Sequence, residues 1–256
     1  MTDRIRLDRL LVARGLYETR ARAADAIRRG AVKVNRKPAA KPGQPVAQDA
    51  GIAIEDPAKA YVSRAALKLL AALEAHPFPV RGALCADIGA STGGFTQVLL
   101  ERGAKKVFAV DAGHGQLSPL LRADARVVNL EGLNARDLTP AHIPVELDVI
   151  VSDVSFISLK KALPAALALA RGGAHLAALI KPQFEAGREH IGKGGVVRER
   201  AVRAAVCEDI RQWLEKTGWP VSGLTSSPLA GADGNAEYLI VARKKEKDQL
   251  QSPRTA

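Results

Sequence analysis

The chain has 256 residues, 47% of them hydrophobic and 25% charged, an ordinary globular composition with enough length for one large domain and one small one. Its formal net charge of +11 indicates a polyanionic partner, nucleic acid before an anionic membrane surface, because clustered Lys and Arg side chains release counterions from phosphates. The two cysteines are far apart, which argues against a disulfide scaffold and a zinc site. The charged N-terminus argues against secretion, and the lack of a run of about 20 apolar residues argues against a membrane span. We therefore expect a cytoplasmic protein.

A basic segment opens the chain, because residues 1–60 contain thirteen Lys or Arg against seven Asp or Glu. Apolar spacing predicts two short amphipathic helices in it, one over 7–11 that Gly15 is placed to end and one over 23–27. Strand-like runs follow at 31–35 and 51–55. The segment therefore predicts a compact α+β module with a basic surface.

The boundary of this module is predicted near residue 60. Residues 37–43, with two prolines, are typical of a loop inside the module, whereas 56–60 are typical of a linker that leaves it. A helix is expected next, over 63–75, with Ser63 as its N-cap.

Residues 61–245 show the pattern of an α/β domain. Short apolar runs alternate with helical segments after Pro79, which predicts a doubly wound, mostly parallel sheet. The runs lie at 83–88, 107–110, 126–130, 147–152 and 174–180. A long helix is predicted at 199–216, and the two late runs at 220–226 and 237–243 have no helix between them, which predicts an antiparallel pair. Residues 246–256 are polar, and we expect a disordered tail.

A glycine-rich turn follows the first predicted strand of this sheet, in the string Asp87-Ile-Gly-Ala-Ser-Thr-Gly-Gly-Phe-Thr. Glycines at a strand-to-helix turn let a ligand approach the backbone closely. The spacing differs from G-x-G-x-x-G and no G-K-[ST] follows, so a ligand without a pyrophosphate fits better, and S-adenosylmethionine is such a ligand. Asp111 ends the next strand, where a carboxylate can hold both ribose hydroxyls. The candidate cofactor residues are Asp87, Gly89, Ala90, Ser91, Thr92, Gly93, Gly94, Phe95 and Asp111.

Two polar residues end neighbouring predicted strands, Asp153 and Lys181. The carboxyl ends of parallel strands meet at one crevice, so we expect the two side chains to converge there. A ribose hydroxyl is a poor nucleophile that needs a group to accept its proton, and a lysine amine can do so in a buried site. Lys181 is the candidate for that role, and Asp153 could position it and face the sulfonium, although helix N-capping is an equally good interpretation of Asp153 alone. By spacing alone, Lys68 and Glu237 are predicted to lie at the surface.

Several strings in this order resemble the TlyA family of ribosomal RNA 2′-O-methyltransferases, within the wider FtsJ-like group. The resemblance covers nearly the whole chain. It rests on Arg6-Leu-Asp-Arg-Leu-Leu-Val, Ala31-Val-Lys-Val-Asn, Tyr61-Val-Ser-Arg-Ala-Ala-Leu-Lys-Leu, the glycine-rich string, Asp111-Ala-Gly-His-Gly-Gln-Leu, Ser152-Asp-Val-Ser-Phe-Ile-Ser-Leu and Lys181-Pro-Gln-Phe-Glu.

The resemblance implies a Rossmann-like class I methyltransferase sheet with an antiparallel last strand, preceded by an RNA-binding domain like that of ribosomal protein S-four. It implies S-adenosylmethionine as cofactor and, as substrate, a cytidine ribose in small-subunit and large-subunit ribosomal RNA within ribosomal particles. It places Lys68 and Glu237 in a catalytic Lys-Asp-Lys-Glu tetrad with Asp153 and Lys181. Asn134 falls at the adenine side of the cofactor, with Asp137 as an alternate. The implied RNA contacts are Arg6, Arg9, Arg20, Arg28 and Lys33.

Other classes of function compete with this interpretation. Members of the family are also labelled haemolysins, but the sequence lacks apolar spans. Carbon methylation of a pyrimidine base usually needs a cysteine nucleophile, and both Cys85 and Cys207 lie away from the predicted crevice. Amino-group methylation usually brings an Asn- or Asp-Pro-Pro-aromatic string, where this chain has Asp153-Val-Ser-Phe. An RNA-binding factor without catalysis is a further alternative, although every member of the implied tetrad is present.

Overall fold

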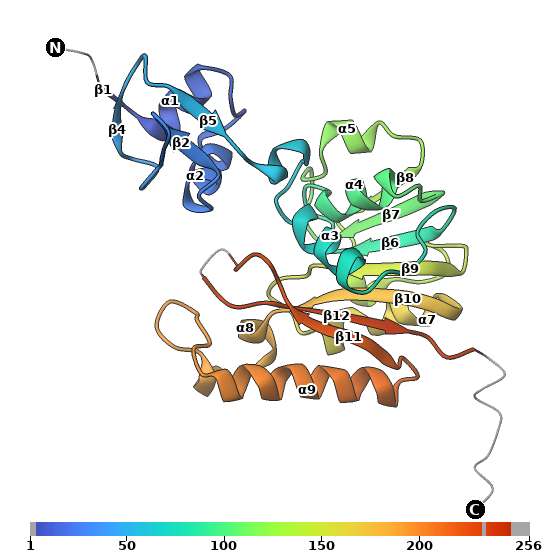
Figure 1. The fold of residues 1–256 in the computed structure, drawn as a ribbon. Coiled ribbons are helices and arrows are strands. Elements are labelled where there is room, and N and C mark those ends of the chain that lie inside the picture. Colours follow the sequence, from blue (N-terminus) through green and yellow to red (C-terminus); the bar gives the residue numbers. More distant parts are fainter. Residues whose placement is uncertain (1–3, 232–233, 247–256) are drawn as a thin grey trace, which may run out of the picture. The chain divides into compact units, whose positions relative to one another are not determined.

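The computed structural model describes residues 4–231 and 234–246, and the chain divides into two compact units, Met1–Ala60 and Tyr61–Ala256 (Figure 1). The division falls where the sequence places the domain boundary. Of the tail for which disorder is predicted, only Glu246 is among the described residues.

Unit 1 contains the two helices and the two strands that the sequence predicts. In chain order its elements are β1 (Arg4–Arg6), α1 (Leu7–Ala13), α2 (Arg20–Arg28), β2 (Val32–Val34), β3 (Lys37–Pro38), β4 (Pro45–Ala47), β5 (Ile52–Ile54) and a 3-10 helix at Pro57–Ala60. Gly15 follows the end of α1 with a φ of +66°, and the Thr19 hydroxyl caps α2 by accepting from the Arg22 N–H at 3.2 Å. The large apolar side chains Leu7, Leu11 and Ile27 are at most 2% exposed and form the core.

Two predictions for unit 1 are wrong in part. The predicted loop over 37–43 begins with β3, which pairs antiparallel with β2. The predicted linker over 56–60 is structured, because the Asp56 carboxylate accepts hydrogen bonds from Arg29 at 2.8 and 3.0 Å and from the Tyr17 hydroxyl at 2.9 Å. Strands of two or three residues and a bond that spans 27 residues leave no periodic pattern in the sequence.

Unit 2 is built on one mixed sheet, in which the seven strands of the described residues have the order β11-β12-β10-β9-β6-β7-β8. The strands are β6 (Leu84–Ile88), β7 (Lys106–Asp111), β8 (Val127–Glu131), β9 (Leu147–Ser152), β10 (Ala170–Ile180), β11 (Val221–Ser226) and β12 (Tyr238–Arg243). The five strands from β6 to β10 run parallel, and β12 lies antiparallel between β10 and β11. The predicted α/β class, parallel sheet and late antiparallel pair are confirmed.

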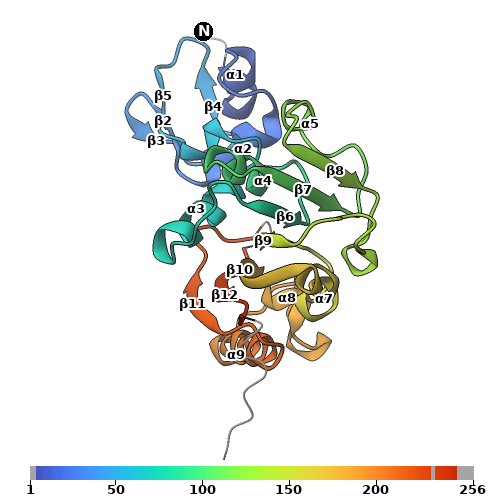
Figure 2. The same cartoon turned by 90° about the vertical axis from the view of Figure 1, so that its right-hand side faces the viewer.

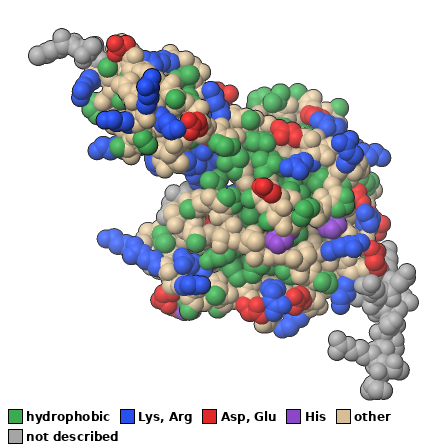
Figure 3. Space-filling model, in the orientation of Figure 1, with side chains coloured by type: hydrophobic (Ala, Val, Ile, Leu, Met, Phe, Trp, Pro, Cys, Tyr) green, Lys and Arg blue, Asp and Glu red, His purple; other side chains and the backbone are tan. Residues whose placement is uncertain are grey.

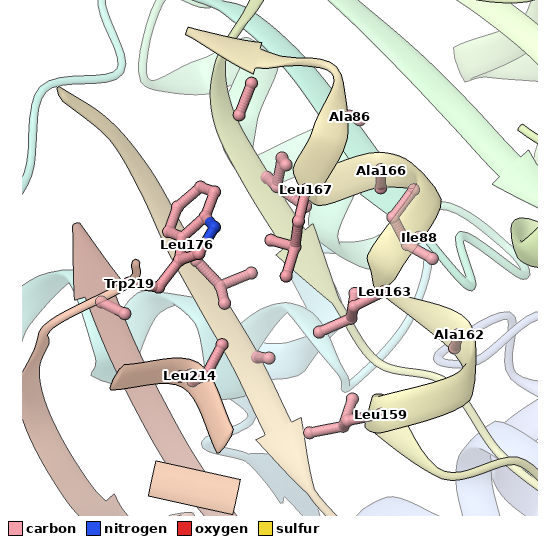
Figure 4. Close-up of a cluster of buried hydrophobic side chains, with 14 of the residues drawn as sticks. Ala86, Ile88, Leu159, Ala162, Leu163, Ala166, Leu167, Leu176, Leu214 and Trp219 are labelled. Carbon is pink, nitrogen blue, oxygen red and sulfur yellow. The ribbon is translucent and has the colours of Figure 1, made fainter. Parts of the chain in front are cut away.

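Helices cover both faces of this sheet, and Figure 2 shows α3 on one side and α7 on the other. The helices are α3 (Ala66–Ala75), α4 (Gly94–Glu101), α5 (Pro119–Arg122), α6 (Leu159–Ala162), α7 (Pro164–Ala168), α8 (Pro182–Glu185) and α9 (Arg200–Lys216). Side chains of α3, α4 and α5 form one apolar cluster with the sheet, and those of α6, α7 and α9 form the other. In the second cluster, Leu163, Leu176 and Trp219 pack between helices and strands (Figure 4).

The start of α3 differs from the prediction. The helix begins at Ala66, its N-cap is Ala65 without a side-chain cap, and the Ser63 hydroxyl instead accepts from the Ala65 N–H at 3.2 Å. The turn before the helix packs against α4, since a Cβ on Gly94 would lie 3.0 Å from Ser63 Cβ and 3.1 Å from Ala66 N. This close packing of two chain segments overrides the local capping preference.

Candidate active site

The carboxyl ends of β6, β7, β9 and β10 border a crevice in unit 2. It consists of a cavity of about 560 Å³ and an adjoining one of about 1080 Å³, and ligand sites are on the order of 300–1,000 Å³. Gly89, Asp153 and Gln183 are among the residues that line both cavities. The two cavities therefore form one crevice where the polar residues at the strand ends converge.

Lys68, Asp153, Lys181 and Glu237 (the tetrad) come together in the smaller cavity. Lys68 on α3 donates to Glu237 Oε2 at 2.6 Å, and its Nζ lies 3.7 Å from Asp153 Oδ2. The Nζ of Lys181, at the end of β10, lies 2.7 Å from Asp153 Oδ1. Asp153 therefore lies between the two lysines, and two positive charges balance two negative ones.

The tetrad is largely removed from solvent, because Lys68, Lys181 and Glu237 are 6%, 8% and 4% exposed. The expectation from spacing alone that Lys68 and Glu237 lie at the surface is wrong. Helix α3, which carries Lys68, contacts β12, and Glu237 directly precedes β12 and therefore lies next to Lys68. A charged side chain is rarely buried without a partner, and here Lys68 and Glu237 are partners of each other.

The glycine-rich turn is held in place by the neighbouring strands. Gly89 has a φ of +85°, and a Cβ there would lie 3.1 Å from the carbonyl oxygen of Asp153. The Asp111 carboxylate accepts from the N–H groups of Ser91 and Gly113, at 2.7 Å each, and lines the larger cavity. Each of its oxygens keeps acceptor capacity for a hydroxyl of a ligand.

Asp87 lines the smaller cavity and is 1% exposed. Its Oδ2 accepts from the N–H and the hydroxyl of Thr96 at 2.9 and 2.7 Å, whereas its buried Oδ1 has no hydrogen-bond partner among the described residues. Burial raises the pKa of this carboxyl to about 7. A buried acceptor without a partner is costly, so Oδ1 offers a position for a ligand donor.

Most of the other predicted cofactor residues border the crevice, with two exceptions. Ala90, Ser91, Thr92, Gly94 and Phe95 line the smaller cavity, and Asn134 lines the larger one. Gly93 lines neither, because its position has a φ of +96° and faces Leu121 and Leu117, where a Cβ would collide. Asp137 is exposed in a 3-10 turn and also lines neither, so Asn134 is the better of the two alternatives.

The crevice-lining residues that are absent from the sequence-based candidates include Ser155, Phe156, Gln183 and Phe184. Ser155 Oγ accepts from Lys181 Nζ at 2.8 Å. Phe156 is 91% exposed, with its ring 5.1 Å from that of Phe184. The buried Oε1 of Gln183 has no hydrogen-bond partner among the described residues. All four follow Asp153 or Lys181 by two or three residues, so their closeness to the predicted strand ends was the available signal.

The five predicted RNA contacts lie in unit 1, whose face in Figure 3 carries more Lys and Arg than Asp and Glu. Arg9 and Arg28 are exposed. Lys33 Nζ lies 2.7 Å from Glu55 Oε1. Arg6 and Arg20 both contact the carboxylate of Asp8. Three of the five side chains are therefore paired within the unit, which the sequence did not indicate.

Other classes of function would need a reactive thiol, a cluster of metal ligands or a membrane-spanning helix. Both cysteines are buried, and burial raises the pKa of Cys85 to about 12 and that of Cys207 to about 11, so neither is a ready nucleophile. Over residues 4–231 and 234–246, no group of three or more His, Cys, Asp or Glu side chains is arranged to hold a metal ion. Within the same ranges, no helix has the length and apolar character needed to cross a membrane.

Comparison with known proteins identifies the family. Residues 61–244 match the model of the FtsJ-like methyltransferase, and residues 5–51 match the S4 domain. The chain belongs to the FtsJ-like methyltransferase family. This membership agrees with the fold of unit 2.

Individual relatives within this family cover most of the chain. The 16S/23S rRNA (cytidine-2′-O)-methyltransferase TlyA of Mycobacterium tuberculosis is 46% identical, over 95% of this chain and 91% of its own length. The 23S rRNA (cytidine-2′-O)-methyltransferase TlyA of Campylobacter jejuni is 35% identical, over 74% and 73%. A solved structure from Streptococcus thermophilus, described as a hemolysin, superposes with a TM-score of 0.75 at 40% identity and covers 96% of this chain and 90% of its own.

Proposed function

We propose that this chain is an S-adenosylmethionine-dependent methyltransferase that modifies the ribose 2′-hydroxyl of cytidine in ribosomal RNA within ribosomal subunits. The observation that carries the proposal is the buried tetrad in the crevice, with Lys181 Nζ 2.7 Å from Asp153 Oδ1. The names of the relatives from M. tuberculosis and C. jejuni support the substrate, and the S4 domain match supports RNA as the partner.

The crevice fits the proposed cofactor on its own chemistry. S-adenosylmethionine, when bound, supplies a methyl group on a positively charged sulfur. Asp111 has acceptor capacity for ribose hydroxyls, and the unpartnered Oδ1 of Asp87 can accept from an ammonium group. Asn134, at the larger cavity, is the proposed contact on the adenine side.

The tetrad supplies proton handling and orientation. Lys181, in its neutral amine form, is the proposed acceptor of the proton of the ribose hydroxyl, and Asp153 then balances the ammonium that forms. Asp153 and Ser155 hold its Nζ from two sides, at 2.7 and 2.8 Å, which fixes the direction of the amine. Lys68 Nζ faces Asp153 Oδ2 from the other side at 3.7 Å, and Glu237 Oε2 holds that lysine at 2.6 Å. Because the site is buried, these groups act with little screening by water.

The exposed Phe156 is proposed to stack on the target nucleobase. An aromatic ring that is 91% exposed at the edge of a crevice gains nothing from burial within the protein. Enzymes and binding proteins use such rings as platforms for unstacked RNA bases. The contact with Phe184 gives the ring a fixed support.

The experiment that tests this function is incubation of separated small and large ribosomal subunits with labelled methyl donor, followed by mapping of the label. We expect label on the 2′-oxygen of a cytidine, in one or both subunits. Label on a base, or no transfer to ribosomal RNA in either subunit, would contradict the proposal.

A further inference from the structure

The carboxylate of Asp8, near the start of α1, accepts hydrogen bonds from residues of β1, α1 and α2 in unit 1. Asp8 is 3% exposed. Arg6 donates to it through Nε at 3.1 Å and Nη2 at 2.9 Å, and Arg20 donates through Nη2 at 3.0 Å. The backbone N–H of Arg9 adds a bond to Oδ1 at 2.9 Å. The two Nη2 atoms share the same oxygen, Oδ2, so the two guanidinium groups are neighbours.

The two arginine side chains remain half exposed although their heads are held. Their exposed fractions are 48% for Arg6 and 52% for Arg20, against 5% for the Asp8 side chain. The Arg6 head also packs over Gly43, where a Cβ would lie 3.2 to 3.3 Å from its guanidinium atoms. Hydrogen bonds of 3.0 Å from Asp8 N to Pro42 O and from Leu7 N to Gln44 O hold the loop that carries this glycine. Arg6 is therefore fixed by both a carboxylate and a backbone surface.

The group carries a net positive charge and free donor capacity. Arg6 and then Arg20 hold the pKa of the Asp8 carboxyl well below its usual range, so the acid stays ionised beside two cations. The bonds to Asp8 use Nε and one Nη2 hydrogen of Arg6 and one Nη2 hydrogen of Arg20. The remaining guanidinium N–H groups can donate to a phosphate, which matches the planar fork of arginine.

We propose that Asp8 is a positioning residue that holds Arg6 and Arg20 as one phosphate-binding site for the RNA backbone. This inference rests on the proposed action on ribosomal RNA. A free arginine side chain loses rotamer entropy when it is ordered, and Asp8 removes part of this cost before the RNA binds. The alternative to positioning is that Asp8 only neutralises the positive charge of the two arginines and so weakens RNA binding. The two roles predict changes of opposite sign when the carboxylate is removed.

The test is the affinity of full-length Asp8→Asn for purified ribosomal subunits at several salt concentrations. The variant has one negative charge less, so plain electrostatics would tighten binding. Positioning by Asp8 instead predicts weaker binding, by about tenfold, and a log–log salt slope that is shallower by about 0.7 to 0.9, which corresponds to one lost phosphate contact. Asp49→Asn is the charge-matched control, because Asp49 is exposed in the same unit, and it should bind as tightly as the wild type or more so.

Further readouts separate positioning from damage to the fold. In Asp8→Asn the KM for subunits should rise while the single-turnover rate at saturating subunits stays the same. Should this variant unfold, Arg6→Lys is the second test, because lysine keeps the charge but cannot make the two-point bond to Asp8. Weaker binding of Arg6→Lys is expected. Equal or tighter binding of Asp8→Asn, or wild-type binding of Arg6→Lys, would overturn the inference. Neither result would affect the proposed reaction, which fails only if the wild type does not methylate subunits.

Discussion

Removal of the Lys181 amine tests the proposed chemistry most directly. Lys181→Met keeps the length of the side chain and deletes Nζ, which lies 2.7 Å from Asp153 Oδ1 and 2.8 Å from Ser155 Oγ. Loss of a general base slows a reaction by about 10² to 10⁴-fold, which corresponds to a barrier higher by roughly 3 to 5 kcal/mol. We expect a loss of single-turnover methyl transfer in this range, with affinity for the methyl donor changed by no more than a few-fold.

The same substitution has a second, separate cost in stability. Deleting one partner of a buried ion pair destabilises a protein by about 3 to 5 kcal/mol. Here we expect the lower end or less, because Asp153 is 14% exposed at its side chain and Lys68 remains 3.7 Å away. Unfolding must therefore be followed alongside activity, at a temperature where the variant is folded.

The assay uses labelled methyl donor with saturating ribosomal subunits in a single turnover, calorimetry for donor binding, and denaturant unfolding. Lys160→Met is the matched control, since Lys160 is paired with Asp209 at 2.6 Å and does not line the crevice. It should retain the wild-type rate. A Lys181→Met enzyme that transfers methyl groups within a few-fold of the wild-type rate would remove Lys181 from the role of proton acceptor.

Three further predictions concern the rest of the crevice. Lys68→Met should destabilise the fold by about 3 to 5 kcal/mol, because it leaves the buried Glu237 carboxylate without its partner. Adding Glu237→Gln should restore most of this loss, as measured by denaturant unfolding. Additive losses in the double variant would disprove the coupling. Burial raises the pKa of Asp87 to about 7, so the folded protein holds a proton there that the unfolded chain releases near pH 4, and stability falls as the pH rises from about 4 to 7. Asp87→Asn should remove this fall in donor-free unfolding measured from pH 5 to 8, and an unchanged pH profile would contradict the assignment. Phe156→Ala should raise the KM for subunits, with a loss of about 1 to 3 kcal/mol expected for a stacking ring, and should leave donor affinity unchanged. A change in donor affinity instead would place this ring at the cofactor.

The regular elements of unit 2 were predictable because their patterns are local. Buried parallel strands such as β9 are short apolar runs, and the predicted range 147–152 coincides with the observed one. The long amphipathic helix α9 was predicted to within one residue at its start. The short strands β1 and β4 were not predicted, since three residues carry no period and their pairing joins positions about 40 residues apart.

Some residues of the candidate site were also predictable from local patterns, whereas others depend on tertiary packing. Asp153 and Lys181 were identified from their places at the ends of predicted strands, which a parallel sheet brings together. Lys68 and Glu237 were assigned only through family resemblance, because their burial depends on the packing of α3 against β12. Gly93 and Asp137 are close in sequence to residues that line the crevice, but residue spacing does not show which positions of a turn face it.

The amino-acid order alone therefore determined the class of fold, the basic module and the segments that border the crevice, because strand periodicity, glycine turns and charge are properties of neighbouring residues. Tertiary structure decided which charges are buried and which partners they meet. Lys68 and Glu237 lie 169 residues apart in the chain, and 27 residues separate Arg29 from Asp56. Such pairs form only when separate elements pack, and their energy depends on exclusion of water from both partners at once, which no local pattern records.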